Sequence, residues 1–421
     1  MNKHNALQLT VVASALLSGA AWATDGYFPH GYGMKALGMG GASVAMTDNA
    51  FAGANNPATA AFAGNRYELG VNLFSPKRSA VTSDGQGGLM ETKSESNFFL
   101  VPEFGYNKKI DAKTSLGLTV YGNGGMNTNY PVPLLSQPSS GATRTGVDLM
   151  QLIVAPTVAY KLNDQHAIGV SPLLVYQKFK AEGLQGFGIS PDKGSDSSSG
   201  IGVRLGYFGQ LSDQISVGLS HSPKISMGKF EKYAGLFANQ GGFDIPANSA
   251  VGVAIQATPT VKVAVDYQKI KYGSVASIAN SSLNMFQCQT SPSYCLGGIN
   301  GPGFGWSDVN VVKLGLEWAY SSVVTLRAGY NKSTNPIHGA DVTFNILAPG
   351  VISKHYTLGG TYKLSRDSEL TWAYMYAPRN SVTGNSLLGQ MAVAQGQALS
   401  SWNETIRMSQ QSLGVQYGWK F

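Results

Sequence analysis

Apolar and polar residues alternate along most of the chain from about residue 65 onward. In the last segment one face carries Leu413, Val415, Tyr417, Trp419 and Phe421. Alternation with a period of two indicates β-strands, because successive side chains of a strand point to opposite faces. About fourteen strands are expected, near residues 65–74, 96–108, 114–122, 148–162, 165–180, 200–211, 214–226, 246–257, 259–272, 309–320, 322–332, 354–364, 368–379 and 408–421.

Short connections alternate with long ones along this series. The tight turns are residues 163–164, 211–213, 258–259, 320–322 and 365–367. The long loops, rich in Gly, Ser, Asn and Pro, are residues 123–146, 183–199, 273–307, 334–353 and 381–405. Tight turns at one end and long loops at the other are typical of outer-membrane barrels, and an even strand count fits a closed barrel with both termini in the periplasm.

Aromatic residues gather near the predicted strand ends, where a membrane barrel places its interface girdles. The best examples are Tyr106, Tyr160, Tyr176, Tyr267, Trp318, Tyr320, Tyr376 and Trp419. Phe421 ends the chain in phase with the apolar face, and we interpret it as the terminus read by the barrel assembly machinery. A soluble β-sandwich would alternate as well. The turn asymmetry, the girdles and the last residue instead predict an all-β fold, a transmembrane antiparallel β-barrel over residues 65–421.

The first residues have the features of a secretory signal peptide. Lys3 precedes an apolar run, and Ala21-Trp22-Ala23 is a small-x-small cleavage site. The run is too short to cross a bilayer of about 30 Å as a helix, which disfavours the alternative of a membrane anchor. We expect residues 1–23 to be removed and the mature protein to reach the bacterial outer membrane as a multi-pass protein.

The composition agrees with a membrane barrel. Charged residues make up 13% of the chain, about half the usual share in soluble proteins, while 43% are apolar. These values argue against a cytosolic enzyme and against a disordered chain. The net charge of +7, or +6 without Lys3, includes no run of five basic residues. We therefore expect no nucleic-acid partner.

Cys288 and Cys295 lie close together in a loop, and an exported protein with two cysteines is expected to join them in a disulfide. A metal site is the alternative, but no further Cys or His stands at ligand spacing. The histidines are scattered and no nucleophile elbow or phosphate loop occurs. We expect no metal, no cofactor and no catalytic site. A barrel lipase assembled from different strands is the enzymatic alternative, although the adjacent His221 and Ser222 would point to opposite faces.

Residues 24–64 lack the alternation and are rich in Gly, Ala and Asn. Such a segment is too irregular for lipid, and a barrel of about fourteen strands is wide enough to hold it. We predict a plug, or hatch, in the lumen; the alternative is a disordered periplasmic tail.

The stretch GMGGASVAMTDNAFAGANNPATAAF resembles the N-terminal hatch of the FadL/TodX family of outer-membrane transporters for hydrophobic compounds, including the triplet Asn56-Pro57-Ala58. The resemblance continues through Val101-Pro102, the glycine-rich Asn123-Gly124-Gly125 and the terminal Phe421. It implies capture of an apolar ligand by the long loops, passage to a pocket in the barrel, hatch movement, and lateral exit through a gap beside a kinked third strand. Gly124 and Gly125 would supply the kink; a plain extracellular turn is the alternative.

Loop residues with apolar side chains are candidates for an external ligand groove. Leu134 and Leu135 come from one loop, and Phe230, Tyr233 and Phe237 fit one face of a short helix beside Lys229 and Lys232. The expected partners are a hydrophobic small molecule, such as a fatty acid, an alkane or an aromatic hydrocarbon, and the bilayer with its lipopolysaccharide. The protein is expected to be a monomer. A general diffusion porin is the alternative function, and it would need an open constriction without a plug.

Overall fold

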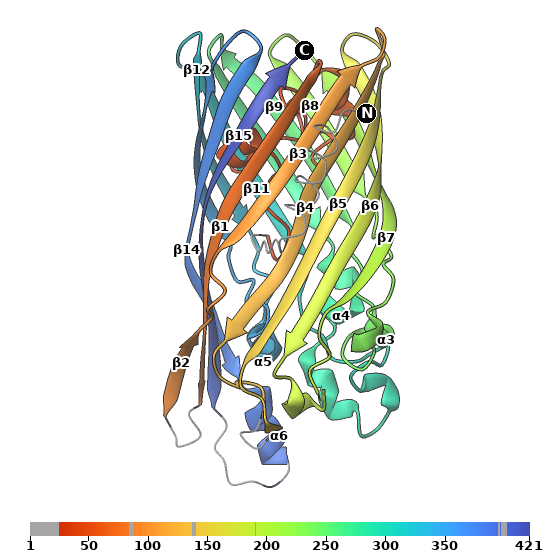
Figure 1. Ribbon diagram of the computed structural model, residues 1–421, viewed down its shortest axis with the longest axis vertical. Coiled ribbons are helices and arrows are strands. Elements are labelled where there is room, and N and C mark those ends of the chain that lie inside the picture. Colours follow the sequence, from red (N-terminus) through yellow and green to blue (C-terminus); the bar gives the residue numbers. More distant parts are fainter. Residues whose placement is uncertain (1–24, 84–87, 137–139, 190, 395, 397–401) are drawn as a thin grey trace, which may run out of the picture.

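The computed structural model describes residues 25–83, 88–136, 140–189, 191–394, 396 and 402–421, and the expected signal peptide lies outside them. The chain forms one antiparallel β-barrel (Figure 1). Its strands are β1 (Arg66–Ser83), β2 (Leu89–Lys93), β3 (Phe99–Lys109), β4 (Thr114–Tyr130), β5 (Thr145–Lys161), β6 (His166–Glu182), β7 (Asp196–Gln210), β8 (Ile215–Ser222), β9 (Asn248–Thr258), β10 (Val261–Ile270), β11 (Val309–Ala319), β12 (Val324–Ser333), β13 (Lys354–Lys363), β14 (Ser368–Asn385) and β15 (Asn403–Lys420).

The barrel closes where β1 pairs with β15, from Arg66 opposite Lys420 to Val81 opposite Thr405. On its other side β1 pairs with two strands in succession, β3 along residues 66–74 and β2 along residues 79–83. β2 and β3 therefore occupy one position in the wall, and the strands of the described chain form a closed barrel of 14, as predicted. Closure matters because lipid offers no hydrogen-bond partner to a strand edge.

Several strands run further than the alternation suggested. The predicted long loops at residues 123–146 and 381–405 are partly strand, because β4 reaches Tyr130, β14 reaches Asn385 and β15 begins at Asn403. Outside the hydrocarbon a strand is held by its ladder hydrogen bonds and needs no apolar face, so the alternation weakens before the strand ends. β8 stops earlier than predicted, at Ser222, because Pro223 has no N–H to donate.

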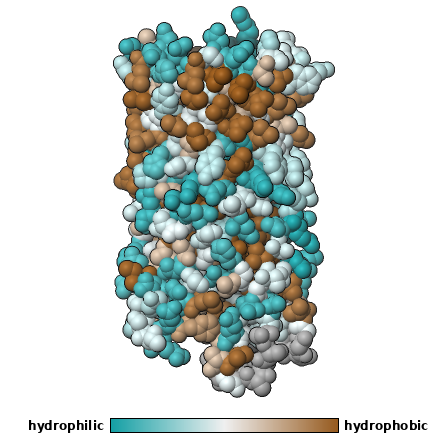
Figure 2. Space-filling model, turned by 180° about the vertical axis from the view of Figure 1, so that it is seen from behind, coloured by the Kyte–Doolittle hydropathy of each residue, from teal (hydrophilic) through white to brown (hydrophobic). Residues whose placement is uncertain are grey.

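The outer wall carries an apolar belt toward the end with the tight turns, where the C-terminus also lies (Figures 1 and 2). Outward side chains such as Leu314 and Leu413 stay about half exposed although they are large and apolar. Among the predicted girdle residues, Trp318 and Trp419 lie near the tight turns and Tyr267 lies toward the loops, all outward-facing. Exposed apolar side chains in a band between aromatic residues are what a lipid-facing wall requires.

Residues 25–64, which we call the luminal segment, lie inside the barrel and are almost entirely buried. The segment contains the helix α2 (Met34–Gly38), next to β12, β13, β14 and β15, and the 3-10 helix η1 (Pro57–Ala61), next to β4, β5, β6 and β7. It therefore spans the lumen from one wall to the other.

The barrel wall approaches the luminal segment at backbone distance through inward-facing glycines. At each of them an added Cβ would lie 3.1 Å or less from a luminal atom. They are Gly105, Gly124, Gly169, Gly206, Gly218, Gly252, Gly315, Gly329, Gly359 and Gly414. This ring of glycines accounts for part of the high glycine content, since any side chain there would displace the luminal segment.

The loops opposite the tight turns pack into one apolar cluster that also includes inward strand residues and, from the luminal segment, Tyr27, Phe28 and Phe51. The helices in the described part of these loops are short: η3 (Gln185–Phe187), η4 (Glu231–Tyr233), α3 (Ala238–Gly241), η5 (Tyr272–Ser274), α4 (Ala276–Ala279), η6 (Ser282–Gln287), η7 (Pro292–Tyr294), η8 (Gly339–Asp341), α5 (Val342–Asn345) and α6 (Leu387–Ala394). Within the described part of the chain no helix has the length and apolar character to cross a membrane.

Candidate transport pathway

The hydrogen-bonded wall is interrupted between β3 and β4. The two strands pair from Lys109 opposite Ser115 only as far as Phe104 opposite Val120. Beyond that point residues 99–103 of β3 still pair with β1, and residues 121–130 of β4 still pair with β5. We call the unpaired stretch between them the window. A strap of chain closes its far end, since Ser94 N–H donates to Arg78 O at 2.9 Å and Glu95 N–H donates to Asn129 O at 2.8 Å.

The glycines predicted to kink the third strand lie at the window. The β4–β5 register shifts between Gly122 and Gly124, so that Asn123 is an extra residue in the ladder, which is a β-bulge. Gly124 and Gly125 therefore lie within β4 and not in the extracellular turn considered as the alternative. The luminal segment packs directly on this bulge, because a Cβ on Gly124 would overlap the carbonyl oxygen of Tyr27. Only glycine leaves room for that contact.

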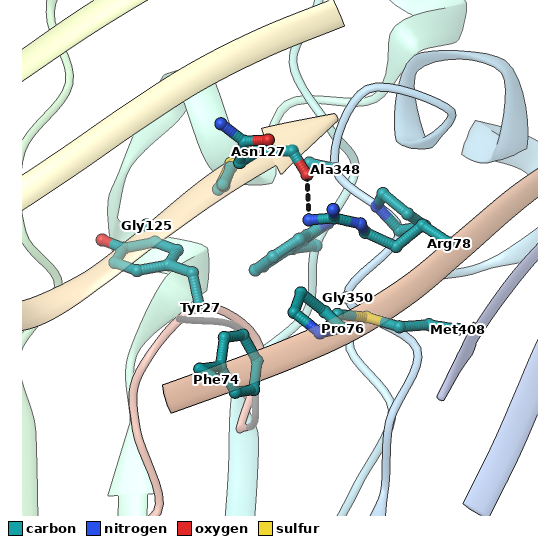
Figure 3. A pocket seen from close by; sticks show the side chains of 12 residues that line it. Tyr27, Phe74, Pro76, Arg78, Gly125, Asn127, Ala348, Gly350 and Met408 are labelled. Carbon is teal, nitrogen blue, oxygen red and sulfur yellow. Dashed lines mark hydrogen bonds between the residues drawn. The ribbon is translucent and has the colours of Figure 1, made fainter. Parts of the chain in front are cut away.

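An apolar pocket, which we call the inner pocket, lies behind the window (Figure 3). Its lining is Tyr27, Phe74, Pro76, Arg78, Gly125, Met126, Asn127, Trp306, Ala348, Pro349, Gly350 and Met408. The free space inside it is about 20 Å³, roughly the room that one water needs and far below the cavity of about 150 Å³ that holds benzene. The inner pocket is thus too small for an apolar ligand and must widen before such a molecule can enter.

Arg78 is the one charged side chain in that lining. Its side chain is buried, with 4% of the residue exposed, and its guanidinium lies 5.6 Å from the centre of the Phe99 ring. One Nη donates to Asn127 O, whereas Nε and the other Nη have no hydrogen-bond partner. No acidic side chain of the described residues pairs with it. A buried cation without a counter-ion costs several kcal/mol, so this position favours an anionic ligand group.

The luminal segment enters the inner pocket through a turn at residues 25–28, which we call the N-terminal turn. Tyr272 holds this turn: its hydroxyl accepts from Tyr27 N–H at 3.0 Å and Phe28 N–H at 3.2 Å, and donates to Asp25 O at 2.7 Å. The Tyr27 ring packs against Tyr272, with ring centroids 5.2 Å apart. A shift of Tyr27 would therefore change the inner pocket and the bulge at Gly124 together.

A second apolar pocket, the outer pocket, lies among the extracellular loops. It is lined by Val147, Phe179, Leu184, Phe187, Leu236, Phe237, Ser277, Leu296, Pro302, Gly303, Phe304, Phe344 and Leu347. Leu347 lines the outer pocket and its neighbour Ala348 lines the inner one. This thin partition is tied to the window strand, because Thr128 Oγ1 donates to Leu347 O at 2.8 Å and Tyr130 donates to Ile346 O at 3.1 Å.

The predicted external groove takes a different form in the structure. Leu135, Phe230, Tyr233 and Phe237 are all at most 5% exposed, and only Phe237 lines the outer pocket. The aromatic residues do not share a helix face, because this stretch breaks into η4 and α3 and its rings pack on Phe179 instead. Leu134 is partly buried against the same cluster. Aromatic side chains in a loop gain more from burying one another than from staying exposed.

The triplet Asn56-Pro57-Ala58 fixes one side of the luminal segment to the wall. Asn56 is fully buried and caps η1 by accepting from Ala58 N–H at 3.1 Å. Its Nδ2 donates to Val44 O at 2.8 Å and to Tyr207 O of β7 at 2.9 Å. Pro57 stands at the first helical position, where a missing N–H costs nothing. The triplet thus serves as an anchor, with the wall glycines Gly169 and Gly206 making room for it.

Ion pairs hold the opposite side. Lys35 of α2 lies 2.7 Å from Glu369 of β14 and 3.8 Å from Glu68 of β1. Wall side chains also accept the backbone N–H groups of the luminal segment: Glu103 from Gly33 at 3.0 Å and Asp266 from Ser43 at 2.7 Å. The wall therefore supplies hydrogen bonds that a segment with little secondary structure cannot supply for itself.

The structure joins Cys288 and Cys295 in a disulfide in the loop between β10 and β11. Within the described ranges no group of three or more His, Cys, Asp or Glu side chains is placed to hold a metal ion. His221 is exposed and bonds to Ser249 at 2.8 Å, whereas Ser222 is buried, so the adjacent pair does not form a hydrolytic site. Phe421 lies beside Tyr106, with stacked rings 5.9 Å apart.

Sequence reasoning missed Tyr27 and Arg78, which lie at the centre of the inner pocket. Arg78 does carry a signal: the alternation continues through Phe74 and Pro76 on the inward face of β1, and Arg78 is the next residue of that face. The predicted strand ends at residue 74, so Arg78 lies outside the predicted strands. Tyr27 lies in a stretch without periodicity, and no local pattern could have placed it at the window.

The chain was also compared with known proteins. The family model described as outer membrane protein transport protein (OMPP1/FadL/TodX) matches residues 11–421. Three solved structures, among others, are similar to the chain. The values in parentheses are the sequence identity, the share of this chain that is covered, the share of the other chain that is covered, and the TM-score. The three structures are the toluene transporter TodX of Pseudomonas putida (20%, 93% and 99%, 0.68), the toluene transporter TbuX of Ralstonia pickettii (17%, 93% and 99%, 0.63) and a FadL homologue of Pseudomonas aeruginosa (14%, 94% and 100%, 0.68).

At these identities the solved structures establish the fold alone, and a comparison with curated sequences gave no match. The family model, which covers nearly the whole chain, establishes more. Its members are outer-membrane transporters of hydrophobic compounds, and the closed barrel with an apolar belt fits that location. The chain belongs to the OMPP1/FadL/TodX family of outer-membrane transport proteins.

Proposed function

We propose that this protein takes up apolar molecules that carry a carboxylate, of which long-chain fatty acids are the expected class. The observation that carries this proposal is Arg78, a buried guanidinium without an acidic partner in the described residues, at the edge of an apolar pocket. An acyl chain gains about 0.8 kcal/mol for each buried CH₂, and a carboxylate would compensate the guanidinium charge. An uncharged aromatic hydrocarbon would leave that charge unpaired.

The proposed route passes from the outer pocket, across the partition at Leu347 and Ala348, into the inner pocket and out through the window. Phe98 and Leu100, beside the window, point outward and are 71% and 52% exposed. These side chains form an apolar edge of the window that faces the membrane, so a ligand that leaves through the window would enter lipid directly. The luminal segment fills the path through the barrel toward the periplasm, so exit into the periplasm is disfavoured.

The proposed gate is the N-terminal turn and not the whole luminal segment. The inner pocket has room for roughly one water, and Tyr27 is the lining residue that touches both the pocket and the bulge at Gly124. A ligand that displaces Tyr27 would widen the pocket and free the bulge in one movement. The rest of the luminal segment is held by the Asn56 anchor and the Lys35 ion pairs.

Uptake of radiolabelled oleate and toluene in a strain without its own transporter tests the carboxylate role. Arg78→Met should lower oleate uptake about tenfold or more, because a charged hydrogen bond contributes about 1.5–3 kcal/mol. Toluene uptake should stay within about twofold, and Arg78→Lys should retain part of the oleate uptake. Lys178→Met, at an exposed outward position of β6, is the control. Equal oleate uptake by Arg78→Met and the wild type would show that the carboxylate is not recognised here.

Single-channel recording separates this transporter from a general diffusion porin. The intact protein should give no steady ohmic current in planar bilayers, because the described lumen is filled and the cavities at the pathway are small. A large persistent conductance from the intact chain would favour the porin.

Two further expectations stay predictions: that Phe421 is the terminus read by the assembly machinery, and that the protein is a monomer.

A further inference from the structure

Basic side chains gather on the outer wall at the extracellular ends of β1, β2, β14 and β15. Lys77, Lys93, Arg379 and Arg407, which we call the basic cluster, line a cavity of about 400 Å³ together with Glu91. The strand register brings them together, because Ser79 of β1 is paired with Lys93 on one side and with Arg407 on the other. Lys77 is the preceding outward position on β1.

Charge within the basic cluster is not balanced. Arg407 pairs with Glu91 at 3.1 Å, and Ser79 donates a hydrogen bond to the same carboxylate at 2.7 Å. Lys77, Lys93 and Arg379 form no ion pair with any described residue. The four cations share the single carboxylate of Glu91, so a net positive charge remains, and an anion bound among them would relieve their repulsion.

The position of the basic cluster relative to the apolar belt identifies its surroundings. The outward apolar residues of β1 and β15 end at Leu73 and Leu413, which are 45% and 54% exposed and lie opposite each other. Lys77 follows four residues after Leu73, which for a strand tilted by about 45° places it roughly 9 Å further outward. That is the level of the lipid headgroups in the outer leaflet.

We propose that the basic cluster binds the phosphate groups of an outer-leaflet glycolipid, whose acyl chains lie on the outward apolar side chains below. The guanidinium of Arg379 can form paired hydrogen bonds to a phosphate, and the two lysines supply point charges. A multiply charged phosphate ligand matches three free cations better than a single carboxylate does. The site adjoins the transport route, because Arg78 and Met408 border both this cavity and the inner pocket.

Native mass spectrometry of the full protein in detergent micelles, titrated with diphosphorylated lipid A, tests this proposal. The test variant is Lys77→Gln/Lys93→Gln, which removes two cations without breaking the Arg407 to Glu91 pair. The control is Lys178→Gln/Lys332→Gln, which removes two outward lysines at the extracellular ends of β6 and β12. The test variant should bind lipid A roughly thirtyfold more weakly, because each lysine near a phosphate surface contributes about a factor of five.

Three results would overturn the proposal. The first is equal weakening in the test and control variants, which would mean a general effect of surface charge. The second is equal affinity of the wild type for lipid A with and without its phosphates. The third is unchanged lipid A binding in the test variant with lost binding of oleate, which would make the basic cluster a carboxylate site on the exit route.

Discussion

Two parts of the luminal segment, residues 33–61 and the N-terminal turn, are held by different kinds of interaction. From Gly33 to Ala61 the segment is fixed by ion pairs, by buried side-chain hydrogen bonds and by wall glycines that admit its backbone. The N-terminal turn instead rests mainly on aromatic packing, and its polar groups have two side-chain partners, the hydroxyl of Tyr272 and the amide of Asn331, which donates to the Asp25 carboxylate at 3.2 Å. Polar contacts of fixed geometry resist displacement, whereas an apolar ligand can replace aromatic contacts at little cost. The contrast indicates a plug with a fixed body and a movable end.

The largest expected effect comes from breaking the fixed body. Lys35→Met leaves the buried carboxylates of Glu68 and Glu369 without this cation, and removing one partner of a buried pair costs about 3–5 kcal/mol. We expect a loss of about 3 kcal/mol in the free energy of unfolding from detergent micelles, and steady conductance in planar bilayers as the body loosens. Lys178→Met is the matched control. A variant with the wild-type free energy of unfolding and no steady conductance would show that the ion pairs do not hold the segment.

A smaller effect is expected from Gly218→Val, which tests the close approach of wall and segment. Its Cβ would overlap the carbonyl oxygen of Val44, and overpacking of this kind costs about 1–3 kcal/mol. Gly235→Val is the control, because no atom lies within 4 Å of a Cβ at that loop position. Equal unfolding free energies for the two variants would mean that the close contact between wall and segment at Gly218 does not restrict side-chain size there.

The smallest change, Tyr272→Phe, acts on the movable end alone. It removes the hydroxyl that forms hydrogen bonds with the backbones of Asp25, Tyr27 and Phe28. Loss of these bonds should lower the stability of the turn by about 1–2 kcal/mol. Hydrogen exchange should rise in the N-terminal turn and stay unchanged from Gly33 to Ala61, and oleate uptake should rise. Tyr376→Phe, on the lipid-facing side of β14, should change neither. Faster exchange throughout the segment would contradict the division into body and end.

The barrel could be predicted because each strand repeats the same period, and β11 and β13 match the expected segments almost to the residue. The pathway could be predicted only in part. Gly124 and Gly125 were found through the family resemblance, because residues 123–146 were predicted as a loop and glycine alone would also fit a plain turn. Tyr27 and the buried Phe230 were not placed, because their positions depend on contacts with residues far away in sequence. Long-range packing of irregular segments leaves no periodic signal.

The pairing of β1 with β15 has a consequence for how the protein is made. The first and last strands meet only when the whole chain is present, and such distant contacts form late. The luminal segment directly precedes β1 and forms hydrogen bonds with side chains of strands all along the chain, from β1 and β3 to β13 and β15. It can therefore become ordered only while the barrel closes around it, so that closing the wall and filling the lumen are one step of folding.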